Sequence, residues 1–237
     1  GLYDSDDKEF RGFQYVMQTK PDWMTLETWF WQDFVMKGFP DREVLKDQAG
    51  NLFAETYYYY LLDSHNPGAL FPYLYFKDES QYDGKPQARE IITEFRYDSY
   101  GNVTRTISHG DVLIPEDKKD ISSEYYYDTN KWIVSLSGHT YVKNSNAEVV
   151  AEKWFTYDEN GNLLTETAWL AGGPQNPVYS YTYDSYGNRE TITDPKGFTT
   201  TTVYGENTHT YPTSIINPFF HTSTATYDLR FGKSLTQ

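Results

Sequence analysis

The phrase YDSYGN at residues 183–188 decides the fold, because it occurs again at residues 97–102 and, as YDENGN, at residues 157–162. Each copy places an aspartate three residues before a glycine. The aspartate side chain can accept hydrogen bonds from backbone N–H groups two residues further on, and glycine readily adopts the left-handed conformation that a bulged hairpin loop requires. Each phrase therefore predicts the tip of a β-hairpin. The residues assigned to these tips are Tyr97, Asp98, Gly101, Asn102, Tyr157, Asp158, Gly161, Asn162, Tyr183, Asp184, Gly187 and Asn188.

Partial copies of the phrase extend the repeat along the chain. The same spacing of aspartate and glycine occurs at Asp47 and Gly50 and at Asp194 and Gly197. Tyr-Asp pairs without the glycine recur at 127–128 and 227–228. Self-similarity at a period of roughly 20–50 residues is the signature of repeat architectures. We therefore expect successive hairpins of similar construction.

Alternating patterns flank the turn phrases, for example from Tyr179 to Tyr183 and from Val103 to Ile107. A period of two predicts strands. We expect an all-β fold in which repeated antiparallel hairpins form a curved, open or partly closed sheet. Residues 1–90 would form a β region that leads into the hairpin array of residues 91–237, or the two would be one continuous domain. Within 21–39 a short helix competes with a strand, because the apolar residues fit both periods.

Composition limits the functions that the chain can have. The 237 residues carry a net charge of −14, which repels phosphate backbones and argues against nucleic-acid binding. There is no cysteine, and no apolar run approaches the length of a membrane span. A mass of 27.7 kDa predicts that folding buries roughly 70% of the unfolded surface. The lack of an initiator Met indicates a piece of a longer protein.

Catalytic and metal-binding signatures are weak in this sequence. The five histidines show no pair at the spacing of zinc ligands, and there is no Gly-x-Ser-x-Gly elbow, phosphate loop or dinucleotide fingerprint. Paired carboxylates of a glycosidase cannot be singled out among 34 acidic residues. We expect no enzyme activity, no cofactor and no metal site, with a hydrolase as the weakest alternative.

Aromatic residues offer the main alternative function. Tyrosines gather at 57–60, at 125–127 and at 179–183, and exposed rings with polar tips could stack on sugars. The simpler interpretation, which we favour, is that strand rings alternate between the two faces of a sheet. Three tryptophans, Trp23, Trp29 and Trp31, are candidates for a local core or a docking patch.

The repeated phrases, followed by threonine-rich strands, resemble the YD repeats of Rhs proteins. An opening segment made of Glu9, Phe10, Arg11, Gly12 and Phe13 is similar to the motif that introduces the YD-repeat region of insecticidal Tc-toxin B components and related virulence-plasmid toxins. Residues 213–217 and 225–233 are similar to another part of that region. The resemblance covers most of the chain.

This resemblance implies a secreted or cell-surface protein whose hairpins coil into a hollow β-shell around a toxic C-terminal segment. Its partners would be that enclosed segment of the parent chain or other toxin-complex subunits. The Pro- and Asp-rich self-cleaving core of these families has no match here, and neither has the toxic segment. We therefore assign neither cleavage nor toxicity to these residues, and we expect a non-catalytic structural segment. A glycan-binding surface module is the alternative.

Overall fold

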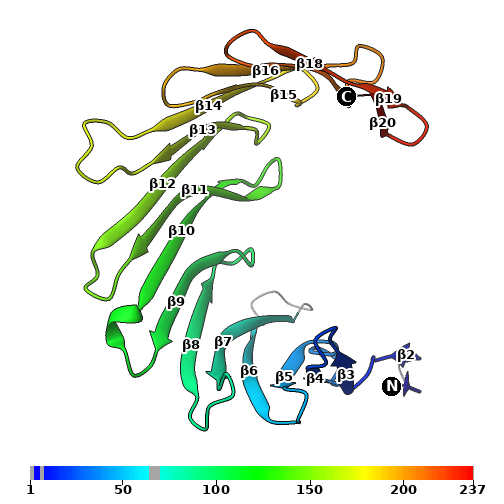
Figure 1. Ribbon diagram of the computed structural model, residues 1–237, viewed down its shortest axis with the longest axis vertical. Coiled ribbons are helices and arrows are strands. Elements are labelled where there is room, and N and C mark those ends of the chain that lie inside the picture. Colours follow the sequence, from blue (N-terminus) through cyan, green and yellow to red (C-terminus); the bar gives the residue numbers. More distant parts are fainter. Residues whose placement is uncertain (1–2, 6–7, 64–69, 237) are drawn as a thin grey trace. The chain divides into compact units, whose positions relative to one another are not determined.

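A computed structural model describes residues 3–5, 8–63 and 70–236. Sixteen strands form one sheet in which strands that follow one another in the chain are neighbours, from β3 at one edge to β18 at the other (Figure 1). Neighbouring strands run antiparallel, as β14 and β15 do. The all-β, hairpin-repeat prediction is therefore confirmed, and the sheet of the described residues is not closed into a barrel.

The strands of the large sheet have the following bounds. The first eight are β3 Tyr15–Thr19, β4 Thr25–Phe30, β5 Pro40–Lys46, β6 Leu52–Asp63, β7 Phe71–Gln81, β8 Arg89–Tyr97, β9 Val103–Asp111 and β10 Lys119–Asp128. The next eight are β11 Ile133–Lys143, β12 Val149–Tyr157, β13 Leu163–Ala168, β14 Val178–Tyr183, β15 Arg189–Thr193, β16 Thr199–Tyr204, β17 Pro212–Ile216 and β18 Thr222–Thr224. Two small hairpins pair β1 Tyr3–Asp4 with β2 Glu9–Phe10 and β19 Thr226–Asp228 with β20 Lys233–Thr236, and a 3₁₀ turn, η1, spans Pro115–Asp117.

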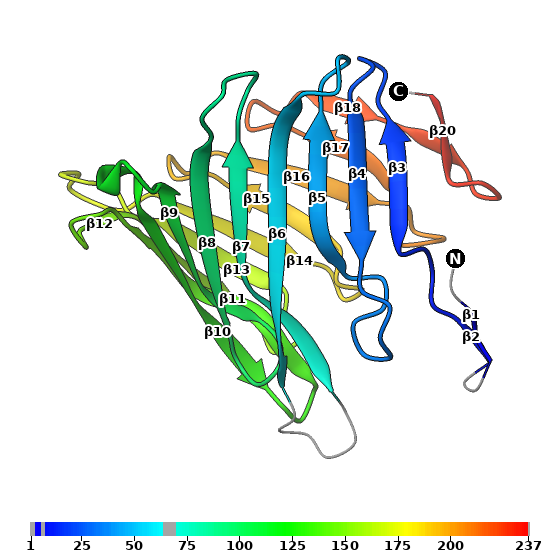
Figure 2. The same cartoon turned by 90° about the horizontal axis from the view of Figure 1, so that it is seen from below.

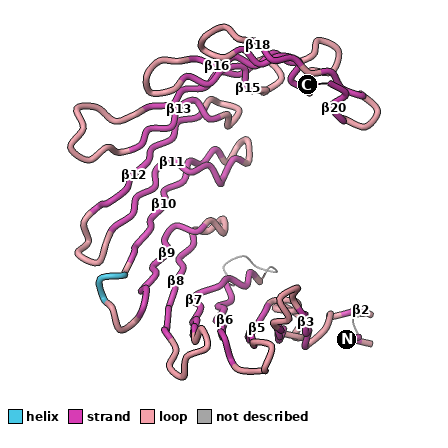
Figure 3. The backbone as a smooth tube through the Cα atoms, viewed as in Figure 1, coloured by secondary structure: helices cyan, strands magenta, loops and turns pink. Residues whose placement is uncertain are grey.

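The chain divides into two compact units. Unit 1 comprises residues 1–122 with 142–150, and unit 2 comprises residues 123–141 with 151–237. In unit 1, strands β3 to β8 lie side by side in chain order (Figure 2). In unit 2, short loops join successive strands at alternating ends (Figure 3). The loops at 158–162, 184–188 and 205–211 consequently lie at one end of the unit 2 strands, and those at 194–198 and 217–221 lie at the other end.

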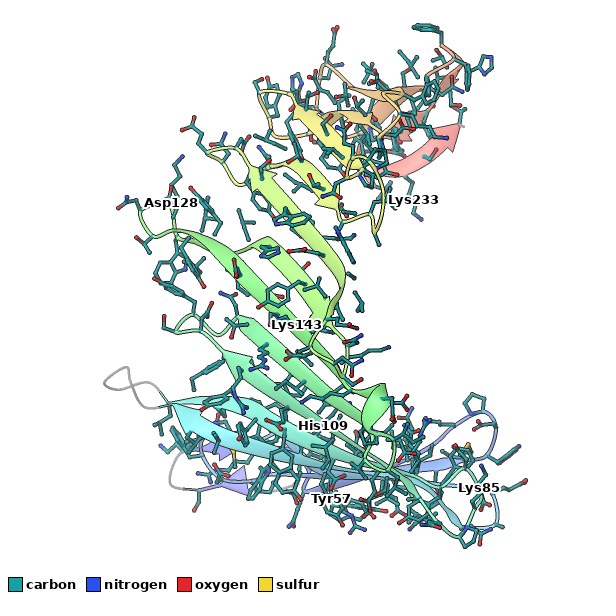
Figure 4. All side chains as sticks on the ribbon, turned by 90° about the vertical axis from the view of Figure 1, so that its left-hand side faces the viewer. Tyr57, Lys85, His109, Asp128, Lys143 and Lys233 are labelled. Carbon is teal, nitrogen blue, oxygen red and sulfur yellow. The ribbon has the colours of Figure 1, made fainter. Side chains whose placement is uncertain are left out.

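In each unit the sheet is a single layer, with side chains on both faces of the strands (Figure 4). Val44, 3% exposed, is the one buried hydrophobic residue in the described part of the chain, and Thr28 and Thr93 are the buried polar residues. The solvent-accessible surface is 15882 Å². Compared with the unfolded chain, that is a burial of about 60%. The expected 70% was too high, because the expectation assumed a globular core.

The helix alternative for residues 21–39 is wrong. The segment contains β4, which pairs with β3 on one side and with β5 on the other, so that Trp29 lies opposite both Tyr15 and Arg42. Two ladders of hydrogen bonds outweigh the weak helical spacing of the apolar residues. Asp33 follows β4 and accepts hydrogen bonds from the backbone N–H groups of Val35 and Met36 in the turn that leads to β5.

Candidate functional site: the five-residue hairpin turn

The repeated phrase forms a five-residue turn whose hydrogen bonds are clearest at Asp158. Its Oδ1 accepts the backbone N–H groups of Asn160 and Asn162, both at 2.8 Å, and its Oδ2 accepts the Asn162 side-chain amide at 2.9 Å. The backbone closes the loop from Asp158 N to Asn162 O at 2.9 Å and from Gly161 N to Asp158 O at 3.1 Å. Gly161 has φ +86°, so the turn requires the left-handed residue that glycine adopts without strain.

Four of the predicted turns share all three side-chain hydrogen bonds. Asp47, Asp98 and Asp184 each accept from the backbone two and four residues on and from the following asparagine amide, at 2.8–2.9 Å. Asp194 also accepts hydrogen bonds from the two backbone N–H groups, at 2.8 and 2.9 Å, but Phe198 occupies the position where the other turns have asparagine. The left-handed positions are held by Gly50, Gly101, Gly161, Gly187 and Gly197.

Two further turns have the same geometry but were not predicted from the sequence. Asn144 accepts the N–H groups of Asn146 and Glu148, both at 3.0 Å, and donates its own amide to the Glu148 carboxylate at 2.9 Å. This pair reverses the chemistry of aspartate and asparagine. Asn217 opens the second turn, and its Oδ1 accepts two backbone N–H groups at 2.9 Å. Ala147 and Phe220, with φ near +63°, replace glycine at the left-handed positions.

These hydrogen bonds favour the charged form of the aspartates. The asparagine amide that donates to the carboxylate holds the pKa of Asp158 and that of Asp184 below the ordinary aspartate value, and backbone N–H groups add to the effect. The same amide donor, from Asn51, lowers the pKa of Asp47. All three aspartates are half-buried in their turns. Their role in the turn is therefore that of a fixed hydrogen-bond acceptor.

The tyrosine that precedes the aspartate ties its hairpin to the previous one. The Tyr157 hydroxyl donates to the backbone carbonyl of Ser137 at 2.8 Å, and the Tyr183 hydroxyl donates to that of Leu163 at 2.9 Å. Both partners lie twenty residues earlier in the chain. Burial raises the pKa of Tyr157 and of Tyr97, which keeps the hydroxyl protonated as a donor. The Tyr-Asp pair thus combines a strap between hairpins with a turn.

Neighbouring strands of unit 2 are also joined by threonine pairs on one face of the sheet. Hydroxyl oxygens of Thr182 and Thr191 lie 2.7 Å apart, and those of Thr193 and Thr199 lie 2.8 Å apart. Thr193 also faces Ser180 in the ladder. These hydroxyls satisfy one another across the strands, which is the sheet equivalent of side-chain pairing along a helix.

The Tyr-Asp pairs at 127–128 and 227–228 form a longer turn. Asp128 accepts the backbone N–H groups of Asn130 and Lys131 at 3.1 and 3.2 Å, and Asp228 accepts that of Arg230 at 3.0 Å. The left-handed residue comes four positions after the aspartate in both, as Trp132 and as Gly232.

The opening motif lies against the loop that follows β4. The Lys37 ammonium pairs with the Glu9 carboxylate, and an Arg11 guanidinium N–H donates to the Gln32 carbonyl at 3.3 Å. The rings of Phe10 and Phe13 meet edge to face with centroids 5.7 Å apart. Gly12 between them has φ +83°, which explains the need for glycine in this motif.

The three tryptophans of the proposed patch occupy different places around β4. Trp23 precedes the strand, has φ +65° and is 68% exposed. Trp29 lies on the sheet face, where its ring packs on Tyr15 at 5.2 Å and beneath the Arg42 guanidinium. Trp31 follows the strand and hydrogen-bonds through its backbone to Phe39. The structure therefore places Trp23 and Trp31 at opposite ends of β4.

His139 lies between two carboxylates. Its Nε2 lies 2.7 Å from a Glu152 oxygen and its Nδ1 lies 3.5 Å from Glu124, and its ring stacks on Trp154. No group of three or more histidines and carboxylates in the described residues is arranged to hold a metal ion. Among those same residues, no helix has the length and apolar character needed to cross a membrane.

Comparisons with known proteins agree with this geometry. Residues 157–199, which contain the turns at Asp158, Asp184 and Asp194, match the family model described as RHS Repeat. The crystal structure of TcdB2-TccC3 is similar at a TM-score of 0.69 and 10% identity, and the same complex with Cdc42 at 0.68 and 11%. The Tc holotoxin pore of Photorhabdus luminescens is similar at 0.60 and 11%. Each match covers 99% of this chain and 20% of the other chain.

The chain therefore spans about one fifth of the length of the solved structures that it matches. No curated protein sequence matches it. Identities of 10–11% carry a likeness of fold. The resemblance to YD-repeat proteins of the Rhs and Tc-toxin type is nevertheless confirmed, because the repeat model and the fold agree. The chain contains an RHS repeat and has the fold of the matching fifth of TcdB2-TccC3.

Proposed function

We propose that the chain is a non-catalytic wall segment of a secreted or cell-surface YD-repeat protein, and that this wall helps to enclose a polypeptide segment of its own parent chain or of a toxin-complex partner. The observation that carries the proposal is the single-layer sheet. Val44 is the only buried hydrophobic residue among the described residues, so the sheet has no packed core beneath it.

The internal bonding of the sheet supports a wall that stands without a second layer. Hairpins are closed by aspartate turns, tied to their predecessors by tyrosine hydroxyls and joined on one face by threonine pairs. Each of these contacts lies within the sheet itself. A sandwich or a globular domain draws its stability from a buried interior instead. The bonding therefore fits a wall that needs no second layer packed on it.

Limited proteolysis of the full-length gene product tests enclosure. We expect the polypeptide that follows the repeats to resist a broad-specificity protease while the wall is folded. A Gly161→Val substitution, which puts a branched side chain at φ +86° beside Leu136, should expose that polypeptide. Gly138→Ala, at a strand position without a left-handed φ, where the nearest atom to the new Cβ is the Glu124 carbonyl oxygen at 3.6 Å, serves as the control. Rapid cleavage of the polypeptide in the unmodified protein would contradict enclosure.

Glycan binding remains a prediction with less support. The exposed rings are divided among separate places, such as Trp23 beside β4, Tyr126 on β10 and Tyr179 on β14. Stacking on a sugar usually combines an exposed ring with polar groups that converge on the same point. A calorimetric titration with soluble oligosaccharides checks this alternative, and binding that is lost on Tyr179→Ala would favour it.

A further inference from the structure

The turn at Asn217 contains a residue that the turn itself does not favour. In five of the seven five-residue turns the left-handed position is glycine, but here it is Phe220, at φ +63°. A bulky side chain is uncommon in this region of backbone conformation because its Cβ crowds the carbonyl that follows. The Phe220 ring is also 87% exposed, more than any other large hydrophobic side chain in the described residues. Folding of this hairpin explains neither feature.

The residues around Phe220 form a small apolar surface at one end of the unit 2 strands. Phe219 beside it is 71% exposed, and its ring lies 6.3 Å from that of Phe198 on the neighbouring turn. Phe220 is one of the residues that line a groove of about 290 Å³, together with Phe198, Thr201 and Ile216. A phenylalanine side chain is small enough to enter a groove of this volume.

We propose that this surface binds a second copy of the chain, with Phe220 of each copy entering the groove of the other. A projecting ring beside a groove that accepts such a ring is self-complementary, which is the requirement for a two-fold symmetric contact. An aromatic residue that fills a pocket is the usual anchor of a protein interface. Burial in the partner would also compensate for the strained backbone of the turn.

Charge favours contact between copies at this surface over most others. The chain as a whole carries −14, so two copies repel each other. Within the turns 194–198 and 217–221 the only charged side chains are Asp194 and Lys196, which balance. A contact made by one ring and one groove from each copy is smaller than the roughly 1,200 Å² of a stable interface, so we expect a weak association that depends on concentration.

Sedimentation velocity over a roughly hundred-fold range of protein concentration tests the proposal. We expect a monomer–dimer equilibrium that Phe220→Gly weakens at least tenfold, although the same change raises the melting temperature by about 2–4 °C because glycine suits the turn. Thr201→Phe, which fills the groove and keeps Phe220, should weaken association as well. Phe231 is an exposed ring at the opposite end of the unit 2 strands, so Phe231→Ala is the matched control and should leave the equilibrium unchanged.

Two results would overturn the proposal. One is a monomer at every concentration. The other is association that Phe220→Gly leaves unchanged, which would place the contact at the unpaired edges of β3 or β18. The opposite effects expected on stability and on association separate loss of the contact from loss of the fold.

Discussion

The hydroxyl of Tyr183, the last residue of β14, donates to the backbone carbonyl of Leu163 on β13 at 2.9 Å. This hydrogen bond ties the hairpin of Tyr183 to the hairpin that precedes it in the chain. Tyr157 makes the same hydrogen bond to Ser137. The tyrosine of the repeated phrase is therefore a cross-hairpin donor as well as a packing ring. In a sheet without a core, such bonds carry a larger share of the stability than they would in a globular protein.

Removal of the Tyr183 hydroxyl tests this strap. Tyr183→Phe keeps the ring but leaves the Leu163 carbonyl without its donor, and we expect the free energy of unfolding to fall by about 0.5–1.5 kcal/mol. Urea denaturation followed by circular dichroism measures the change. Tyr186→Phe, at a ring that is 64% exposed, is the control and should cost less than about 0.5 kcal/mol. Equal effects of the two substitutions would show that the hydroxyl contributes nothing specific.

Substitutions at the left-handed position should act in opposite directions in two turns of the same geometry. Ala147→Gly relieves a non-glycine residue at φ +63° and should stabilise the protein by about 0.5–1 kcal/mol. Gly161→Ala introduces a Cβ at φ +86°, 3.3 Å from Leu136, and should destabilise it by about 1–2 kcal/mol. Melting temperatures from calorimetry check both. Effects of the same sign would contradict the shared turn geometry.

Acid should weaken the sheet through the turn aspartates. Hydrogen bonds in the folded state hold the pKa of Asp47, Asp158 and Asp184 below that of unfolded aspartate, about 3.9. A lowered pKa in the folded state gives stability that is present above the unfolded pKa and is lost as the pH falls through the folded pKa.

Urea midpoints measured from about pH 6 down to pH 2.5 follow this loss. Replacing the three aspartates together by asparagine keeps an oxygen acceptor in each turn, as in the natural turns at Asn144 and Asn217, but removes the titration. The triple variant should therefore show a flatter pH profile. If the midpoints of the variant and the unmodified protein fall in parallel, other groups are responsible.

The one buried hydrophobic residue should be unusually sensitive to truncation. Val44→Ala removes two carbon atoms from a site that is 3% exposed, and we expect a cost of about 1.5–2.5 kcal/mol. Val203→Ala, at a site that is 44% exposed, should cost less than about 0.5 kcal/mol. Guanidinium denaturation measures both, and equal costs would show that the interior around Val44 contributes little.

Much of the fold could be predicted from the sequence because the turn chemistry is local. Asp158 and Gly161 are three residues apart, and their geometry is encoded in that spacing. The turn at Asn217 could not be found in this way, because Phe220 stands where glycine would have marked it. The partner of the Tyr183 hydroxyl also remained hidden, since Leu163 is twenty residues away and is joined through its backbone carbonyl, which no side-chain pattern reveals.

The missing core was hidden for a different reason. Aromatic and β-branched residues alternate in the same way on a sheet that is wet on both faces as on a sheet with one buried face, so periodicity cannot tell the two apart. For the same reason, residues 21–39 were compatible with a helix until β3 and β5 were seen on either side of β4.

Cysteine labelling on the two faces of β15 tests the wall most directly, because the chain has no cysteine of its own. Ile192 and Thr193 are adjacent and therefore point to opposite faces. In the isolated chain, the Ile192→Cys and Thr193→Cys variants should both react with a bulky maleimide before any unfolding. In the full-length gene product, one of the two should become protected and the other should stay reactive. Equal reactivity of both variants in the full-length protein would contradict enclosure, and protection of either in the isolated chain would contradict the single-layer sheet.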